Sequence, residues 1–450
     1  MPNQPSSRFR RSSTRLLTAA AACATLTGAC AQDSATRQAS DLHPIAAQLG
    51  GQDLSASADD LGLNAQVPDD GVQLVGRSFR GHLYSTAGRK PKMARAGALT
   101  EQDLLPPEDG DQGIVLDPAE GPLRSAGYFT GFRMHTEWFG LATGPGLRLP
   151  GGQSLPAAAQ PSAPQAPRWH AQDLWYQPAQ DQHPARLTLV QDGVVIHNDV
   201  ALDARGSADP APLELGHPDA HGVTPQRLRN VWVAPLGGLG HTHAGPWVDL
   251  LSQSNDASVW TLSGGTSLFD YDPDTGILTG TAVANSKGNT FQVTRDTYGD
   301  FELQVEVWTD AATDEHKGMN SGVQIRSHVD GGIDQRDGRI RGYQVEIDPT
   351  ARRFTGGVYD EKRRGWLAPL IAAPAARAAW KSGTWNHLRI QAQGQVIRTW
   401  DNGVPAANLM DALTPSGHIG LQVHGVGDRT DRPQVRFRKV MLRELHAASH

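Results

Sequence analysis

Cysteine is nearly absent from this chain of 450 residues, which contains only Cys23 and Cys30. Both lie within residues 1–30, so the rest of the chain has no disulfide framework. Long apolar runs are also missing, because the clearest one, from Leu16 to Leu26, is too short for a stable membrane span. The length instead allows two or more domains with ordinary apolar cores.

The chain has no block of like charge, since 41 Lys and Arg stand against 47 Asp and Glu, a net charge of −6. Nucleic acids and anionic membrane surfaces select basic patches, so neither is expected as a partner. Long helices are missing too, and the only candidate, Ile371 to Trp380, is weakened by Pro374. The 49 Gly and 30 Pro residues favour turns and short strands.

Residues 1–30 are typical of an export signal, with four arginines before the apolar run and small residues at Thr27-Gly28-Ala29. The next residue, Cys30, fits a bacterial lipoprotein cleavage site or is incidental to an ordinary one. We therefore expect export to the periplasm or cell envelope, with membrane attachment only through a lipid on Cys30. Residues 31–69 are expected to form a flexible tether, and Ser154 to Pro167 an inserted loop.

Three segments near the C-terminus alternate strictly between apolar and polar residues, namely 322–326, 343–348 and 421–424. Strand side chains point to opposite faces with a period of two, so each segment predicts a strand with one buried face. The expected buried set is Val323, Ile325, Val345, Ile347, Leu421 and Val423. The opposite face is expected to carry Gln324, Arg326, Gln344, Glu346, Asp348, Gln422 and His424, which are typical of a polyol-binding surface.

An internal repeat predicts two copies of one all-β domain, each a β-sandwich. Asn198 and Asn402 are matched in strand–turn units, and the Arg-rich segments 226–233 and 434–442 are matched as closing strands. We expect a divergent domain over residues 70–240, a linker over 241–257 and a second domain over 258–447.

The second domain resembles the 3-keto-disaccharide hydrolase-like family, which has a concanavalin A-like jelly-roll fold. The resemblance covers roughly residues 258–445, and the motifs occur in the family's order. They are Gly299-Asp300-Phe301-Glu302-Leu303, Asn320-Ser321-Gly322-Val323, Gly342-Tyr343-Gln344-Val345-Glu346-Ile347, Thr355-Gly356-Gly357-Val358-Tyr359-Asp360, Trp385-Asn386, Trp400-Asp401-Asn402-Gly403, Gly420-Leu421-Gln422-Val423-His424-Gly425 and Val435-Arg436-Phe437-Arg438.

The resemblance implies cleavage of 3-keto-glycosides or 3-keto-disaccharides by elimination and hydration, a net hydrolysis. A C3 ketone acidifies the C2 proton, so the site needs a base, an enolate-stabilising group and a group at the leaving oxygen. The catalytic candidates are Glu346, His424, Asp360 and Arg326, and the candidate sugar contacts are Asn320, Gln324, Gln344, Tyr359, Trp366 and Gln422. A divalent metal ion, held by Glu346, Asp348 and His424, is a candidate cofactor.

Structural interpretations stand beside these functional ones. His424 could satisfy a backbone carbonyl, Glu346 could pair with Arg326 on the surface, Asp348 could form a turn before Pro349, and Tyr359 could be a core residue. Arg352-Arg353 and Lys362-Arg363-Arg364 are most simply solvated loop charges. Glu346-Ile347-Asp348 lacks the second glutamate of a retaining glucanase motif, which disfavours double displacement. The alternative function is a non-catalytic carbohydrate-binding or adhesion module tethered at the cell surface.

Overall fold

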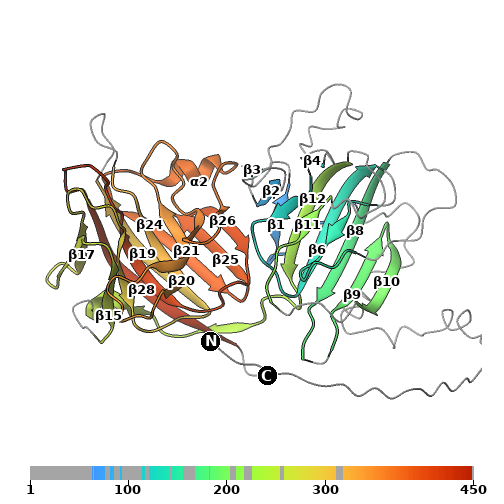
Figure 1. Cartoon of the computed structure of the whole chain (residues 1–450), viewed down its shortest axis with the longest axis horizontal. Helices are drawn as coiled ribbons and strands as arrows, with labels where there is room; N and C mark the ends of the chain where they lie inside the picture. The colour runs from blue at the N-terminus through green and yellow to red at the C-terminus, as the bar shows by residue number, and fades with distance from the viewer. Residues whose placement is uncertain are drawn as a thin grey trace, which may run out of the picture. The chain divides into compact units, whose positions relative to one another are not determined.

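The structure is a computed structural model, and it describes residues 63, 65–76, 82–85, 92–93, 114–116, 121–140, 144–155, 168–181, 183–202, 209–216, 226–253, 258–310 and 318–447. The described residues form two β-sandwiches, which confirms the predicted all-β class (Figure 1). The predicted export signal, Cys30, most of the tether and most of the loop at 154–167 lie outside the described residues.

The N-terminal sandwich is built from residues 72–235 and consists of two sheets. Its core includes the fully buried Phe132, Trp138, Tyr176 and Leu228. One sheet has the order β1 (Val72–Val75), β12 (Gln226–Pro235), β6 (Phe132–Gly140), β8 (Arg168–Gln177), β9 (Arg186–Gln191), β10 (Val194–Ala201), with β4 (Ile114–Leu116) on β12. The other has the order β3 (Lys92–Met93), β2 (Leu83–Ser85), β5 (Leu123–Ser125), β11 (Glu214–Leu215), β7 (Leu147–Arg148).

The C-terminal sandwich also pairs two sheets, which we call the back sheet and the cleft sheet. The back sheet has the order β16 (Leu268–Asp272), β17 (Ile277–Thr281), β28 (Gln434–Ala447), β19 (Phe301–Thr309), β24 (Asn386–Gln393), β25 (Val396–Asp401), β26 (Val404–Met410), with β13 (Thr242–Ala244) and β14 (Val248–Asp249) on β28. The cleft sheet has the order β15 (Trp260–Gly264), β18 (Thr290–Thr294), β27 (His418–Val423), β20 (Ser321–Val329), β21 (Ile340–Ile347), β22 (Val358–Glu361), β23 (Gly365–Ala368).

Among the described residues, two short helices accompany this sandwich. The 3-10 helix η4 (Leu250–Gln253) lies with β13 and β14 inside residues 241–257, so the expected linker contains paired elements. The α-helix α2 (Pro374–Ala379) begins at Pro374, which is tolerated because the first helical turn needs no donor there. In the described part of the chain, no helix has the length and apolar character needed to cross a membrane.

Strand order relates the two sandwiches, because β12-β6-β8-β9-β10 follows the same path as β28-β19-β24-β25-β26. The predicted match of the two closing strands, β12 and β28, agrees with this order. The predicted match of Asn198 with Asn402 is wrong. The turn before β10 is Asp192-Gly193 and the turn before β26 is Asn402-Gly403, with φ of 49°, 75°, 49° and 81°. Two-residue hairpin turns need such positive φ, whereas Asn198 lies inside β10.

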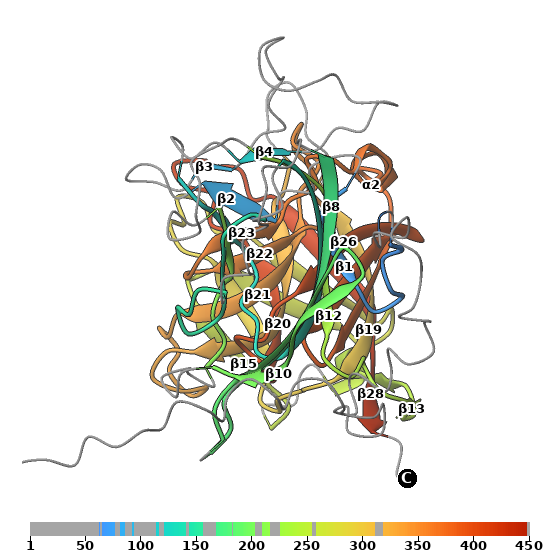
Figure 2. The ribbon, with the colours of Figure 1, turned by 90° about the vertical axis from the view of Figure 1, so that its right-hand side faces the viewer.

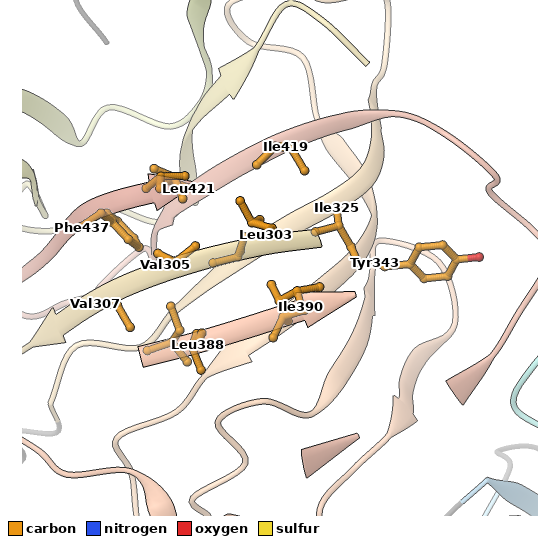
Figure 3. Packing of buried hydrophobic residues seen from close by; sticks show 14 of the residues in the cluster. Leu303, Val305, Val307, Ile325, Tyr343, Leu388, Ile390, Ile419, Leu421 and Phe437 are labelled. Atoms are coloured by element: carbon orange, nitrogen blue, oxygen red, sulfur yellow. The ribbon is translucent and has the colours of Figure 1, made fainter. Parts of the chain in front are cut away.

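The alternating segments form strands with one apolar face, as predicted. Figure 3 shows Ile325 and Leu421 packed with Leu303 and Val305 of β19 in one hydrophobic cluster. The predicted buried set, Val323, Ile325, Val345, Ile347, Leu421 and Val423, has 0% exposure throughout. Burying such a side chain stabilises the fold by about 1.5–3 kcal/mol. The core therefore fixes the register that sends the intervening residues to the other face of the cleft sheet.

Candidate functional site

A cleft of about 960 Å³ lies on the face of the cleft sheet opposite the core. Its lining extends from Gly264, at the end of β15, to Trp366 on β23, so it crosses the whole sheet. Figure 2 shows β20, β21, β22 and β23 as neighbouring strands, in the order given by their hydrogen bonds. In the described part of the N-terminal sandwich, β7 ends the corresponding sheet, and no strands stand where β21 to β23 would be.

Among the residues that line the cleft, Glu346 has the largest shift in pKa. Asn320 Nδ2 donates to its Oε1 at 2.8 Å and Gln344 Nε2 donates to its Oε2 at 2.8 Å. The residue is only 5% exposed, and burial raises the pKa of Glu346 to about 7. The two amide donors and the charge of Arg352 oppose this rise, while Asp348 adds to it. A carboxyl group with a pKa near neutrality can both take and give a proton at physiological pH.

Three glutamine amides, predicted as sugar contacts, form a cluster beside Glu346. Gln344 Oε1 accepts from Gln324 Nε2 at 2.8 Å and from Gln422 Nε2 at 3.0 Å. All three are buried, but only Gln344 and Gln422 line the cleft. Gly322, paired with Glu346 across the strands, makes room for this cluster, because a Cβ there would lie 2.5 Å from Gln344 Cγ and Cδ.

His424 lines the cleft directly after β27, and its Nδ1 lies 2.6 Å from the backbone oxygen of Gly425. A carbonyl oxygen can only accept, so Nδ1 carries the proton and Nε2 of the neutral ring carries a lone pair. The structural interpretation of His424 is therefore correct for one ring nitrogen and leaves the other as a candidate base. β20 alone separates β27 from β21, and the pairing registers put Glu346 level with Gln422. His424 is two residues further along, so its backbone lies about 12 Å from that of Glu346.

Aromatic side chains line the cleft at β22 and β23. Tyr359 and Trp366 are both half-buried, with ring centroids 5.3 Å apart and planes at 75°. Phe354 packs edge-on against Trp366 from behind, at 5.2 Å and 87°. Half-buried rings of this kind offer an apolar face to a pyranose ring while their other side anchors the wall.

Arg352 is an exposed loop charge, as expected, but it also has partners in the cleft. It lines the cleft, its Nη2 lies 3.2 Å from Glu346 Oε1, and its guanidinium lies 5.1 Å from the Trp366 ring centroid. The signal that could have identified it is Asp348-Pro349, since a turn started by Asp348 brings position 352 back over Glu346. Other cleft residues without a sequence motif are Lys287, Asn289, Phe291 and Arg339.

Arg326 does not lie on the cleft face, contrary to the alternation. β20 has a bulge between Ile325 and His328, and Arg326 has a φ of 45°. The extra residue reverses the direction of its side chain, which is fully buried. Its guanidinium donates to the backbone oxygens of Gly299 and Gly394, and to Asp300 Oδ1, each at 2.8 Å. The expected pair with Glu346 is therefore absent, and Arg326 is not placed to act on a sugar.

Asp348 and Asp360 are also outside the cleft lining, and each is occupied by neighbouring groups. Asp348 accepts from Thr350 and from Arg352 Nε, at 2.5 and 2.7 Å. Burial raises the pKa of Asp348, but these bonds outweigh it and hold the pKa below its ordinary value. Asp360 is fully buried and accepts from the Nε atoms of Arg363 and Arg364, at 2.7 and 2.6 Å.

The residues expected to hold a metal do not form a ligand set. Asp348, turned into its own loop, leaves only Glu346 and His424 facing the cleft. Among the residues that the structure describes, no group of three or more His, Cys, Asp or Glu is arranged to hold a metal ion. We therefore assign no step to a metal.

Comparison with known families finds a match over most of the C-terminal sandwich. Residues 246–443 match the family model described as a 3-keto-alpha-glucoside-1,2-lyase-like domain, which gives this part of the chain a carbohydrate-related function. No curated protein matches the chain.

Solved structures with a similar fold have low sequence identity. A Bacillus subtilis protein of unknown function with a galectin-like fold is 12% identical, with a TM-score of 0.34, over 46% of this chain and 100% of that one. A putative glycosyl hydrolase from Parabacteroides distasonis is 19% identical, with a TM-score of 0.29, over 44% and 100%. The carbohydrate-binding module CBM66 from Bacillus subtilis is 14% identical, with a TM-score of 0.28, over 41% and 95%. Likenesses at these scores carry no argument about activity.

Proposed function

We propose that the C-terminal sandwich, which carries the 3-keto-alpha-glucoside-1,2-lyase-like domain, is an enzyme that cleaves the glycosidic bond of 3-keto-glycosides. The observation that carries this proposal is Glu346, a buried carboxyl group with a pKa of about 7 in a polar cleft that His424 also lines. A sugar-binding surface without chemistry has no need to keep a carboxyl group near half-protonation.

The reaction starts with removal of the C2 proton, which the adjacent C3 ketone acidifies. His424 Nε2 takes this proton, and the electron pair forms an enolate whose oxygen is stabilised by the Arg352 guanidinium. The enolate then expels the C1 substituent, and protonated Glu346 gives its proton to the departing oxygen. Water adds across the new C1–C2 double bond, with Glu346 as base and His424 returning the proton to C2, so the net change is hydrolysis.

Sugar binding in this proposal uses both the aromatic and the amide side chains that line the cleft. The Tyr359 and Trp366 rings pack against a pyranose face, and the amides of Asn320 and Gln344 face its hydroxyl groups. Gln324 supports Gln344 from behind and makes no sugar contact.

The test is incubation of the protein with a 3-keto-disaccharide, followed by measurement of released sugar. Glu346→Gln and His424→Ala are expected to lower turnover by at least 100-fold, the lower range for loss of a proton-transfer group. Glu306→Gln and His387→Ala are matched controls on the back sheet and should retain activity. Turnover that survives both cleft changes would contradict the assignment. Binding of unoxidised glycans without any turnover would instead identify a carbohydrate-binding module.

A further inference from the structure

While Glu346 is ionised, the neighbours of Gln344 allow its amide only one orientation. Its Nε2 lies 2.8 Å from Glu346 Oε2, and an ionised carboxylate can only accept. Its oxygen must therefore face Gln324 and Gln422, both of which donate their NH2 groups to it. Ser327 Oγ lies 2.8 Å from Gln324 Oε1 and holds that amide in turn.

We propose that Gln324 and Gln422 are positioning residues that act on Glu346 through Gln344, by holding the Gln344 NH2 group toward the carboxylate. This inference rests on the proposed role of Glu346 in proton transfer. A lone glutamine amide can turn by 180° and present its oxygen instead. Here that rotation would set the Gln344 NH2 against two other NH2 groups and its oxygen against the carboxylate, so three hydrogen bonds would become three repulsive contacts.

Gly322 also contributes to the position of the Gln344 amide. Its φ is not in the left-handed region, so alanine would suit its backbone, yet an added Cβ would lie within 2.8 Å of three atoms of the Gln344 amide arm. Gly322→Ala therefore displaces Gln344 without changing any hydrogen-bonding group. It tests the position of the amide separately from its chemistry.

A change at Gln422 can separate a role in positioning Gln344 from a role in stability. Its Oε1 is buried and has no hydrogen-bond partner among the described residues, while its Nε2 serves Gln344. Gln422→Met removes one hydrogen bond and also one unsatisfied acceptor, so its effect on stability should be small. A merely structural role for Gln422 would then leave the titration of Glu346 unchanged.

The experiment follows the carboxyl titration of Glu346 by carbon-detected NMR in protein labelled at glutamate, with Glu346→Gln to assign the signal, together with the pH profile of turnover. Gln344→Met should raise the apparent pKa by about one pH unit, since it removes a charge-assisted hydrogen bond. Gln324→Met, Gln422→Met and Gly322→Ala should raise it by smaller amounts. Gln391→Met, on β24 of the back sheet, is the matched control and should not shift it.

The decisive comparison is the double variant of Gln344 and Gln422. If Gln422 acts through Gln344, adding Gln422→Met to Gln344→Met gives no further shift. Additive shifts, or unshifted titration in both Gln324→Met and Gln422→Met, would overturn the proposal. Shifted carboxyl titration without turnover would leave the positioning role standing and refute the enzymatic function. Turnover with unshifted titration would do the reverse.

Discussion

Glu346 should make the stability of the C-terminal sandwich depend on pH in a defined direction. Burial raises its pKa from an ordinary 4.5 to about 7, so the folded state binds the proton more tightly than the unfolded chain does. This contribution to stability is fully present below pH 4.5 and is lost as pH rises through 7. At 1.36 kcal/mol per pH unit, the loss is about 3 kcal/mol.

Glu346→Gln removes the titration and keeps the shape of the side chain. The new NH2 group faces donors from Asn320 and Gln344, which destabilises the variant by an amount that does not depend on pH. The informative quantity is therefore the difference in unfolding free energy between variant and wild type, and specifically how this difference changes from pH 5 to pH 8. We expect the unfolding free energy of the variant to gain about 2.5 kcal/mol on that of the wild type over this range.

Hydrogen–deuterium exchange of peptides from β20 and β21 measures this sandwich alone. Comparing the two proteins at the same pH cancels the intrinsic exchange rates. From pH 5 to pH 8, exchange in the wild type should accelerate relative to the variant by roughly 100-fold. An exchange ratio that is the same at both pH values would refute the claim that burial holds the proton on Glu346.

Asp401 provides the control for this measurement. It is fully buried on β25, neither carboxylate oxygen has a hydrogen-bond partner among the described residues, and burial raises its pKa to about 7. Its contribution has the same sign and is shared by the wild type and Glu346→Gln, so it cancels from their difference. Asp401→Asn should remove a separate and additive part of the pH dependence.

Three further outcomes follow from the site geometry. Arg326→Met should lower the free energy of unfolding by about 1–3 kcal/mol, because the backbone oxygens of Gly299 and Gly394 lose their donor, and thermal denaturation would measure this; unchanged stability would contradict the structural role. Trp366→Ala should weaken disaccharide binding in calorimetry by roughly fivefold, the worth of an aromatic contact of about 1 kcal/mol, and an unaltered affinity would exclude the ring as a sugar platform. Treatment with a chelator should leave sugar binding unchanged, whereas a loss restored by adding a divalent ion would show that a metal is bound after all.

Alternation predicts β20, β21 and β27 and the six buried residues expected on them, because burial of one apolar face fixes both the pleat and the register. It also placed Gln344, Glu346, Gln422 and His424 at the cleft. It failed at Arg326, where a bulge adds one residue to the strand and reverses the side chain. A bulge has no apolar pattern of its own, so alternation continues through it in the sequence while the geometry does not.

The positions of loop residues could not be predicted from periodicity, for a different reason. Arg352 reaches Glu346 only because Asp348, with bonds to Thr350 and to the backbone of Phe354, folds the intervening loop back on itself. The same contacts occupy the Asp348 carboxylate. Asp348, which was expected to act in the site, instead fixes the loop that positions Arg352. Side-chain to backbone bonds of this kind decide the course of a loop and are set by three-dimensional closure.

The cleft sheet is packed on both of its faces, with aliphatic residues on one and interlocked amides on the other. Few positions on β20, β21 and β27 can therefore accept a different side chain without disturbing a neighbour. The exposed rim, at Lys287, Arg339 and Lys362, has no such constraint. Divergence in substrate preference within such a scaffold should accumulate at the rim, while the chemistry inherited by the sheet stays fixed.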